Sequence, residues 1–152
     1  MKISYVHGPG NAFGTFLEWR EKKADPSIIK QTYSGQFYDL ISEIDGTGQV
    51  ICITDSENIA GSQFRFDTVE RGIGSGISHY LCEFRYARAV SAKIKEFSPD
   101  IVIISSDFPS YAYDVLPKDP IRILTIHNTF WRPYGSPKGL KEIFLNFATR
   151  IS

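Results

Sequence analysis

Two short apolar runs, Ile101–Ile104 and Ile121–Ile126, constrain the fold more than any other part of the sequence. Runs this rich in Ile and Val are typical of strands that are covered on both faces, as in a parallel sheet. About sixteen residues separate them, with room for a short helix around Tyr111–Leu116, and parallel neighbours need a crossover of that size. We therefore expect a parallel pair whose polar tails, carrying Asp107 and His127, emerge at the same edge of the sheet.

The periodicity of the rest of the chain predicts alternating strands and helices. Strands are expected at Lys2–Val6, Val50–Thr54 and Gln63–Val69, and helices over Ser34–Ile44, over Ser78–Phe97 and after Pro137. This order predicts one α/β domain over residues 1–152, a Rossmann-like three-layer sandwich with a mainly parallel sheet.

Three details follow from the residues within these elements. Ser34 can cap the first of the helices, because its hydroxyl can accept a backbone hydrogen bond there. Arg65 and Asp67 should point outward from a strand that lies toward a sheet edge. Leu81 and Phe84 begin an apolar face of the long helix that steps down to Phe97.

The segment from Asn11 to Thr32 shows no clear regular structure in the sequence. Unstructured stretches of this length are uncommon in compact domains and tend to be lids or binding loops. The alternative is an ordinary insertion whose aromatic side chains, Phe13, Phe16 and Trp19 among them, cover the edge of the core. The sequence leaves both interpretations open.

Composition excludes several classes of function. Lys plus Arg and Asp plus Glu each number 17, so the net charge of zero gives no reason to expect a nucleic acid or an anionic membrane as partner. No apolar run is long enough for a transmembrane segment, and the chain opens directly into a strand. We expect a cytoplasmic protein in which Cys52 and Cys82 are reduced thiols.

Polar residues follow the predicted strands at the edge where ligands of open α/β sheets bind. His7 with Gly8, Asp55, Asp107, and His127 with Asn128 fall at these strand ends. A histidine there can donate a hydrogen bond or carry a proton, and a carboxylate can orient a sugar hydroxyl. A turn-capping role is the simpler interpretation for Asp55 and Asp107. His127 is the better functional candidate, because its polar and aromatic surroundings, which include Trp131, suit a site.

Other motifs carry weaker signals. Gly35, at the start of a helix, offers backbone amides to an anion such as a diphosphate. The glycine run Gly72–Gly76 does not fit a dinucleotide fingerprint, because Ile77 stands where the third glycine is needed. The sequence contains no zinc-ligand spacing, P-loop or nucleophile elbow, so neither a metal nor a cofactor is expected.

Taken together, these motifs resemble the amino-terminal half of a retaining glycosyltransferase of the GT-B fold, in particular glycosyltransferase family 4. The resemblance is carried by Met1–Ile3 leading into a strand and glycine turn, Tyr33–Phe37 opening a helix, Pro99–Ile103, and Ile123–Asn128. The resemblance implies that His127 lies close to the transferred sugar. It also implies that Ser34 and Gly35 face the diphosphate of a nucleotide-sugar donor or the acceptor.

The sequence departs from that family in two respects. The segment from Asn11 to Thr32 is longer than the usual link, and the second domain, which in the family holds most of the nucleotide-sugar site, is absent. The resemblance therefore implies the acceptor-side half of an enzyme that transfers a sugar to a carbohydrate or other hydroxyl acceptor with retention. Its partner would be a missing C-terminal domain or a separate donor-binding chain, and alone it should be nearly inactive.

Two rival interpretations remain. The first is a non-catalytic carbohydrate-binding or partner subunit of a split glycosyltransferase. The second is a generic flavodoxin-like or dinucleotide-binding domain, which would bind a flavin or nicotinamide cofactor, and the poor fit of the glycine runs counts against it.

Overall fold

The computed structural model describes residues 1–21 and 32–125. In chain order the elements are β1 (Lys2–Val6), α1 (Ala12–Glu21), α3 (Tyr33–Glu43), β2 (Thr47–Cys52), β3 (Phe64–Thr68), α4 (Ile77–Phe97), β4 (Ile101–Ser105), the short 3₁₀-helix η1 (Ser110–Val115) and β5 (Ile121–Thr125). The helix predicted after Pro137 lies outside the described residues.

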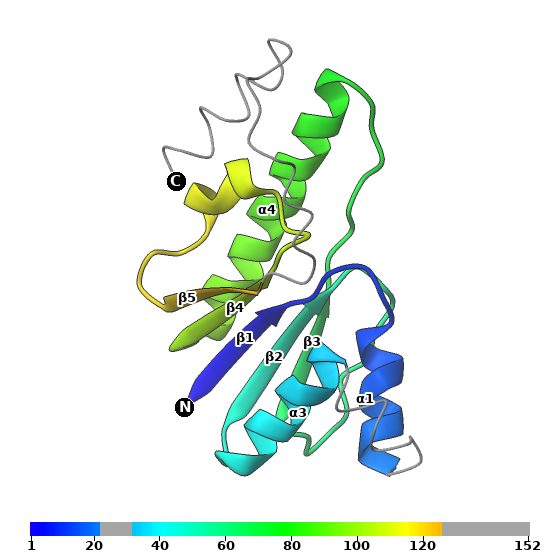
Figure 1. Ribbon diagram of the computed structural model, residues 1–152, viewed down its shortest axis with the longest axis vertical. Coiled ribbons are helices and arrows are strands. Elements are labelled where there is room, and N and C mark those ends of the chain that lie inside the picture. The colour runs from blue at the N-terminus through cyan, green and yellow to red at the C-terminus, as the bar shows by residue number, and fades with distance from the viewer. Residues whose placement is uncertain (22–31, 126–152) are drawn as a thin grey trace, which may run out of the picture.

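All strands of the sheet run parallel, in the order β3-β2-β1-β4-β5. The helices α1 and α3 cover one face over β1 to β3, and α4 with η1 covers the other, as the two core clusters and Figure 1 show. This confirms the predicted Rossmann-like three-layer sandwich. The predicted parallel pairing of β4 with β5 is also confirmed, with Ile103 opposite Ile123.

The order in which strands are added to the sheet reverses at the central strand β1. The chain moves outward from β1 to β2 and β3, and then crosses through α4 to β4 on the other side of β1. In open α/β sheets the crevice beyond such a reversal point is the usual ligand site. The loop that leaves β1 at His7 therefore begins at the most favourable position in the sheet for binding.

The segment from Asn11 to Thr32 contains a helix that the sequence did not reveal, because α1 occupies residues 12–21. The Asn11 side chain starts this helix by accepting a hydrogen bond from Gly14 N at 2.8 Å. Phe16 is almost fully buried and packs against Tyr38, Phe64 and Phe66. Over this helix the aromatic side chains cover the core, as in the second of the two interpretations that the sequence left open, whereas the expectation of no regular structure was wrong for these residues.

The strand β3 is the edge strand that the sequence predicted, but its acidic residue is not exposed. Asp67 accepts hydrogen bonds from Gln49 Nε2 at 2.8 Å and from Arg65, and pairs with Lys93 Nζ at 3.2 Å. The prediction that Asp67 points outward was therefore wrong. A buried carboxylate is tolerated here because three side chains from β2, β3 and α4 satisfy it.

This cluster should make stability depend on acid pH. Burial by itself raises the pKa of Asp67, but hydrogen bonds from Arg65, Gln49 and Lys93 outweigh burial, so the pKa lies below its usual value. The ionised group therefore stabilises the fold above the unfolded-state pKa of about 3.9, and this contribution is lost as the pH falls below that value. Urea midpoints measured from pH 6 to pH 3 should decline less steeply in Asp67→Asn. An equally steep decline would contradict this account.

The helix α4 is longer than the sheet it covers. Its 21 residues span about 31 Å, whereas a strand of five residues spans about 17 Å. The residues that pack on the sheet lie between Tyr86 and Phe97, and the start of the apolar face, at Leu81 and Phe84, is exposed. The first turns of α4 therefore project past the carboxyl ends of the strands (Figure 1).

The strand β5 is less covered than its sequence predicted. Ile121, Ile123 and Leu124 are all exposed, whereas Val102 and Ile104 on the neighbouring β4 are buried. Within the described residues β5 is an edge strand. The helices α1 and α3 lie over β1, β2 and β3 and leave β5 uncovered on that face. The prediction that both apolar runs are covered on both faces is thus wrong for β5. No helix in residues 1–21 or 32–125 is both long and apolar enough to cross a membrane.

Candidate functional site

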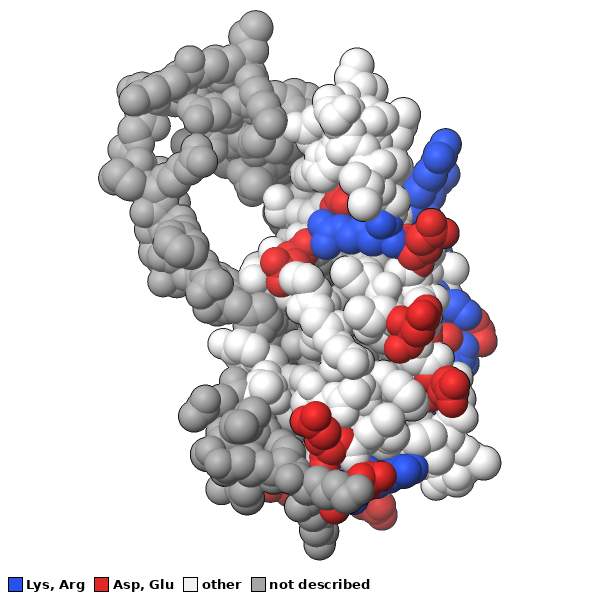
Figure 2. Space-filling view, turned by 90° about the vertical axis from the view of Figure 1, so that its right-hand side faces the viewer, with Lys and Arg blue, Asp and Glu red and all other residues white. Residues whose placement is uncertain are grey.

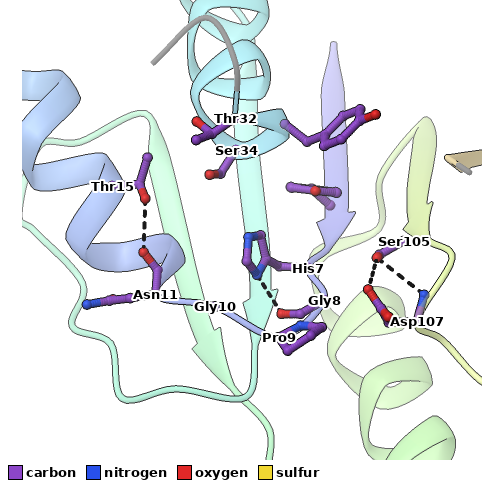
Figure 3. A pocket seen from close by; sticks show the side chains of 12 residues that line it. His7, Gly8, Pro9, Gly10, Asn11, Thr15, Thr32, Ser34, Ser105 and Asp107 are labelled. Atoms are coloured by element: carbon purple, nitrogen blue, oxygen red, sulfur yellow. Dashed lines mark hydrogen bonds between the residues drawn. The ribbon is translucent and has the colours of Figure 1, made fainter. Parts of the chain in front are cut away.

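A cavity of about 320 Å³ opens at the carboxyl ends of β1 and β4, beside the start of α3. In Figure 3, Thr32 and Ser34 lie on one side of it, Ser105 and Asp107 on the other, and His7 between them. The described residues that line it are Tyr5, His7, Gly8, Pro9, Gly10, Asn11, Thr15, Thr32, Tyr33, Ser34, Ser105 and Asp107. Residues from three separate stretches of the chain, 5–15, 32–34 and 105–107, thus meet at the edge where ligands of such sheets bind.

The loop after β1 holds the His7 ring in one tautomer. His7 Nδ1 lies 2.7 Å from the carbonyl oxygen of Gly8. Because a carbonyl oxygen only accepts hydrogen bonds, Nδ1 carries the hydrogen and Nε2 is the basic nitrogen of the neutral ring. Tyr5 packs edge-on against the same ring, with centroids 5.5 Å apart. The loop and the strand together fix the plane of the imidazole.

Tyr5 contributes a neutral phenol to the cavity. Burial, followed by the nearby Tyr33 and the Asp107 carboxylate, raises the pKa of Tyr5 to about 12. The hydroxyl therefore remains protonated at any physiological pH and keeps its ability to donate a hydrogen bond. The sequence analysis missed Tyr5, because the alternating side chains of a buried strand do not indicate which of them reaches the edge of the sheet.

Asp107 both shapes a turn and lines the cavity. Its Oδ2 accepts a hydrogen bond from Ser105 Oγ at 3.1 Å, and its backbone amide lies 3.4 Å from the same hydroxyl. The hydroxyl that caps this turn belongs to Ser105, whereas the Asp107 carboxylate accepts a hydrogen bond from that hydroxyl and lines the cavity. The Asp107 carboxylate also lies close to Gly8, since a Cβ added to Gly8 would collide with Asp107 Oδ2 and lie 2.9 Å from Ser105 Oγ.

An ion pair behind the cavity anchors the Asp107 turn. The Arg71 guanidinium makes two hydrogen bonds to the buried Glu83 carboxylate, at 2.9 and 2.6 Å, and a third at 3.2 Å to the backbone carbonyl of Asp107. Arg71 also lies over the Tyr86 ring, 5.1 Å from its centroid. Sequence reasoning missed both charged residues. The available signal was a carboxylate, Glu83, next to the apolar face of a long helix.

The start of α3 forms the opposite side of the cavity. Thr32, and not Ser34, caps the helix, because Thr32 Oγ1 accepts the hydrogen bond from Gly35 N at 3.1 Å. Ser34 therefore lies inside the first turn and lines the cavity, whereas Gly35 does not line it. The capping prediction for Ser34 was wrong. The Gly35 amide already has a partner within the helix.

The structure thus brings together four of the predicted site residues, which are His7, Gly8, Ser34 and Asp107. Asp55 follows β2 and does not line the cavity. His127, Asn128 and Trp131 lie outside the described residues, so the predictions for them stay predictions.

The charge around the cavity is low. Among its described lining residues Asp107 is the sole carboxylate, and none is Lys or Arg. Within the part of the chain that the structure describes, no group of three or more His, Cys, Asp or Glu side chains is arranged to hold a metal ion. Hydroxyl, phenol, imidazole and carboxylate groups remain, and these are the partners of a neutral ligand rich in hydroxyls.

Comparisons of the chain with protein-family models, with curated proteins and with solved structures give no match.

Proposed function

We propose that this chain is the acceptor-side domain of a retaining glycosyltransferase, and that the cavity at the ends of β1 and β4 binds a sugar hydroxyl acceptor. The observation that carries the proposal is the cavity itself, where His7, Gly8, Ser34 and Asp107 meet at the reversal point of a parallel sheet. The order of motifs that resembles glycosyltransferase family 4 supports the same reading.

The chemistry of the cavity wall favours a neutral polyol. The Asp107 carboxylate can accept hydrogen bonds from a pair of hydroxyls, and the Ser34 hydroxyl can donate or accept. Tyr33, which is exposed at the cavity, offers a flat apolar face on which a sugar ring can stack. Because no described Lys or Arg lines the cavity, a diphosphate would lack a cationic partner there.

The remaining roles follow from the resemblance. The resemblance places either the donor diphosphate or the acceptor at the start of α3, and because no described cation lines the cavity, Ser34 would bind an acceptor hydroxyl. His127 would orient the transferred sugar, with Asn128 and Trp131 beside it. The nucleotide-sugar donor would be bound chiefly by a C-terminal domain or a separate chain, so that this domain alone would transfer sugar slowly or not at all.

Binding measured by NMR on the 152-residue chain tests the proposal. A panel of neutral glycans, nucleotide sugars and free nucleoside diphosphates should give shifts at Gly8, Ser34 and Asp107 with the glycans. Asp107→Asn keeps the shape of the side chain but removes its charge, and should weaken glycan binding by about tenfold to a hundredfold. Asp114→Asn, at an exposed carboxylate away from the cavity, is the matched control. The proposal fails if no glycan shifts these residues, or if both variants bind alike.

A substitution at Gly8 should block the same site without removing a polar group. In Gly8→Ala the added methyl group would displace the Asp107 carboxylate and press on Ser105 Oγ. We expect glycan binding to fall by at least about tenfold. Calorimetric titration reports the affinity, and thermal unfolding of the same sample shows whether the domain stays folded. Unchanged affinity would mean that Asp107 takes no part in binding.

A non-catalytic carbohydrate-binding subunit is the second candidate, favoured by the single carboxylate among the described cavity residues. His127→Ala separates the two. In an enzyme reconstituted with its donor-binding partner, the variant should lose sugar transfer. In a binding subunit it should leave the partner's activity unchanged.

A further inference from the structure

The connection from β2 to β3, residues 53–63, contains no helix, although parallel neighbours are usually joined through one. In Figure 1 it passes from the upper end of β2 to the lower end of β3. Ile59, near its middle, packs against the core cluster beneath these strands. We call this connection the strap.

Both ends of the strap are fixed. Near its start, Thr68 Oγ1 on β3 donates a hydrogen bond to the carbonyl oxygen of Thr54 at 3.1 Å. Near its end, Ser62 N donates to Ile59 O at 3.1 Å, and Gly61, with a φ of +75°, lets the chain turn into β3. The strap is therefore held beside β3 at both ends.

The outer edge of β3 is the part of the sheet that the strap adjoins. Odd-numbered residues of β3 direct their backbone groups toward β2, since Val69 N donates to Cys52 O at 2.8 Å in the continuation of the ladder. The even-numbered residues, Phe64, Phe66 and Thr68, therefore direct theirs outward. Unpaired backbone groups on an edge strand are a template for the strand of another chain.

Side chains of the strap already bind most of these outward groups. Asn58 Nδ2 donates to Phe66 O at 3.0 Å, and Phe66 N donates to Asn58 Oδ1 at 2.8 Å. Phe64 N donates to Ser62 Oγ at 3.1 Å. A carboxamide has the same donor and acceptor as a peptide group, so Asn58 makes with Phe66 the pair of hydrogen bonds that an added strand would make.

We propose that the strap blocks the outer edge of β3, and that the Asn58 carboxamide keeps the strand of another chain from pairing there. Both outward groups of Phe66, the middle residue of this edge, are bonded to Asn58, so an incoming strand must first displace this side chain. Because Asn58 is exposed, burial does not explain its position, whereas the two hydrogen bonds do. The block does not depend on what the cavity binds.

The charge of the strap acts in the same direction. Its two charged residues, Asp55 and Glu57, are both acidic and exposed, and residues 53–63 contain no Lys or Arg. Figure 2 faces the side of the molecule on which β3 is the outermost strand, and it shows acidic side chains spread over that face. Like charges would oppose the approach of a second β3 edge, as charged side chains do on many edge strands.

Amide hydrogen exchange of the 152-residue chain, followed by NMR, tests the contact itself. The Phe66 N–H should exchange at least about tenfold more slowly than the Thr68 N–H, the other outward amide, which has no partner among residues 1–21 and 32–125. In Asn58→Ala this difference should disappear in dilute solution. Equal exchange of the two amides in the parent chain would overturn the proposal, and this comparison needs no substitution.

Sedimentation velocity tests the consequence of the contact. At equal concentration, Asn58→Ala should associate at least about tenfold more tightly than the parent, through pairing of its free β3 edge. Gln63→Ala is the matched control, because it removes a carboxamide of the strap whose side chain makes no hydrogen bond within the described residues, and it should sediment like the parent. Circular dichroism of the same samples shows that the variants are folded.

Asn58→Asp separates the block from a general effect of the substitution. The carboxylate can still accept the hydrogen bond from Phe66 N, and it adds a charge at the edge, so this variant should stay as unassociated as the parent. A folded Asn58→Ala chain that sediments like the parent would overturn the proposal. Association of Asn58→Asp as strong as that of Asn58→Ala would overturn it as well.

Discussion

Replacing Arg71 by Ala should lower the free energy of unfolding by about 3–5 kcal/mol, because it leaves the Glu83 carboxylate buried without its counter-charge. The Glu83 side chain is 4% exposed and its salt bridge, at 2.6 Å, is to Arg71. The substitution also removes the contact of the guanidinium with the Tyr86 ring. Urea unfolding followed by circular dichroism measures the change.

The matched control replaces both charges. Arg71→Met with Glu83→Leu leaves no buried charge, and such exchanges are often neutral or stabilising, so the double variant should recover most of the lost stability. The Asp107 turn would still lack its anchor, because the hydrogen bond from Arg71 to the Asp107 carbonyl is gone. The double variant should therefore fold well and still bind glycans more weakly. A loss below about 0.5 kcal/mol in Arg71→Ala would show that water reaches Glu83.

Phe16→Ala should be about as destabilising, with a loss of about 3–5 kcal/mol. Phe16 is buried among Trp19, Tyr38, Phe64 and Phe66, with ring centroids 5.0 to 5.8 Å away. Truncation removes the transfer energy of the ring and leaves a cavity between α1, α3 and the sheet, which this crowded cluster cannot readily close. Thermal or urea unfolding reports the loss.

The control for Phe16 lies on the same helix. Glu18 is exposed, so Glu18→Ala should change stability by less than about 0.5 kcal/mol. The comparison decides whether α1 is part of the core or a lid on it. If Phe16→Ala were as mild as Glu18→Ala, α1 would contribute little to the folded state.

The parallel sheet could be predicted because its signals are local. The Ile-rich run that becomes β4 and the turn residues after β1 are visible in any short window of the sequence. Since parallel strands end at one edge, alternation of strands and helices was enough to bring His7 and Asp107 together. That part of the site therefore followed from element order alone.

The errors have physical reasons that no short window contains. Asp67 is buried because Gln49, 18 residues away, and Lys93 on α4 satisfy it. The helix α1 was missed because Gly14 and the charges around Glu18 obscured the apolar spacing of Phe13, Phe16 and Leu17. Arg71 escaped notice because its partners, Glu83 and Asp107, belong to elements that meet only in the folded chain.

The close approach of Gly8 to the Asp107 carboxylate has a consequence for how this cavity can diversify. Gly8 meets the side chains of Asp107 and Ser105 with no room for a methyl group, so a larger residue at position 8 would require smaller or displaced side chains at positions 105 and 107. Substitutions that alter which ligand fits are therefore easier at the opposite wall. Asn11 and Thr15 line that wall from the start of α1, and Tyr33 lines it from the start of α3. The wall at Gly8 would thus change only through coupled substitutions, whereas the opposite wall can change one residue at a time.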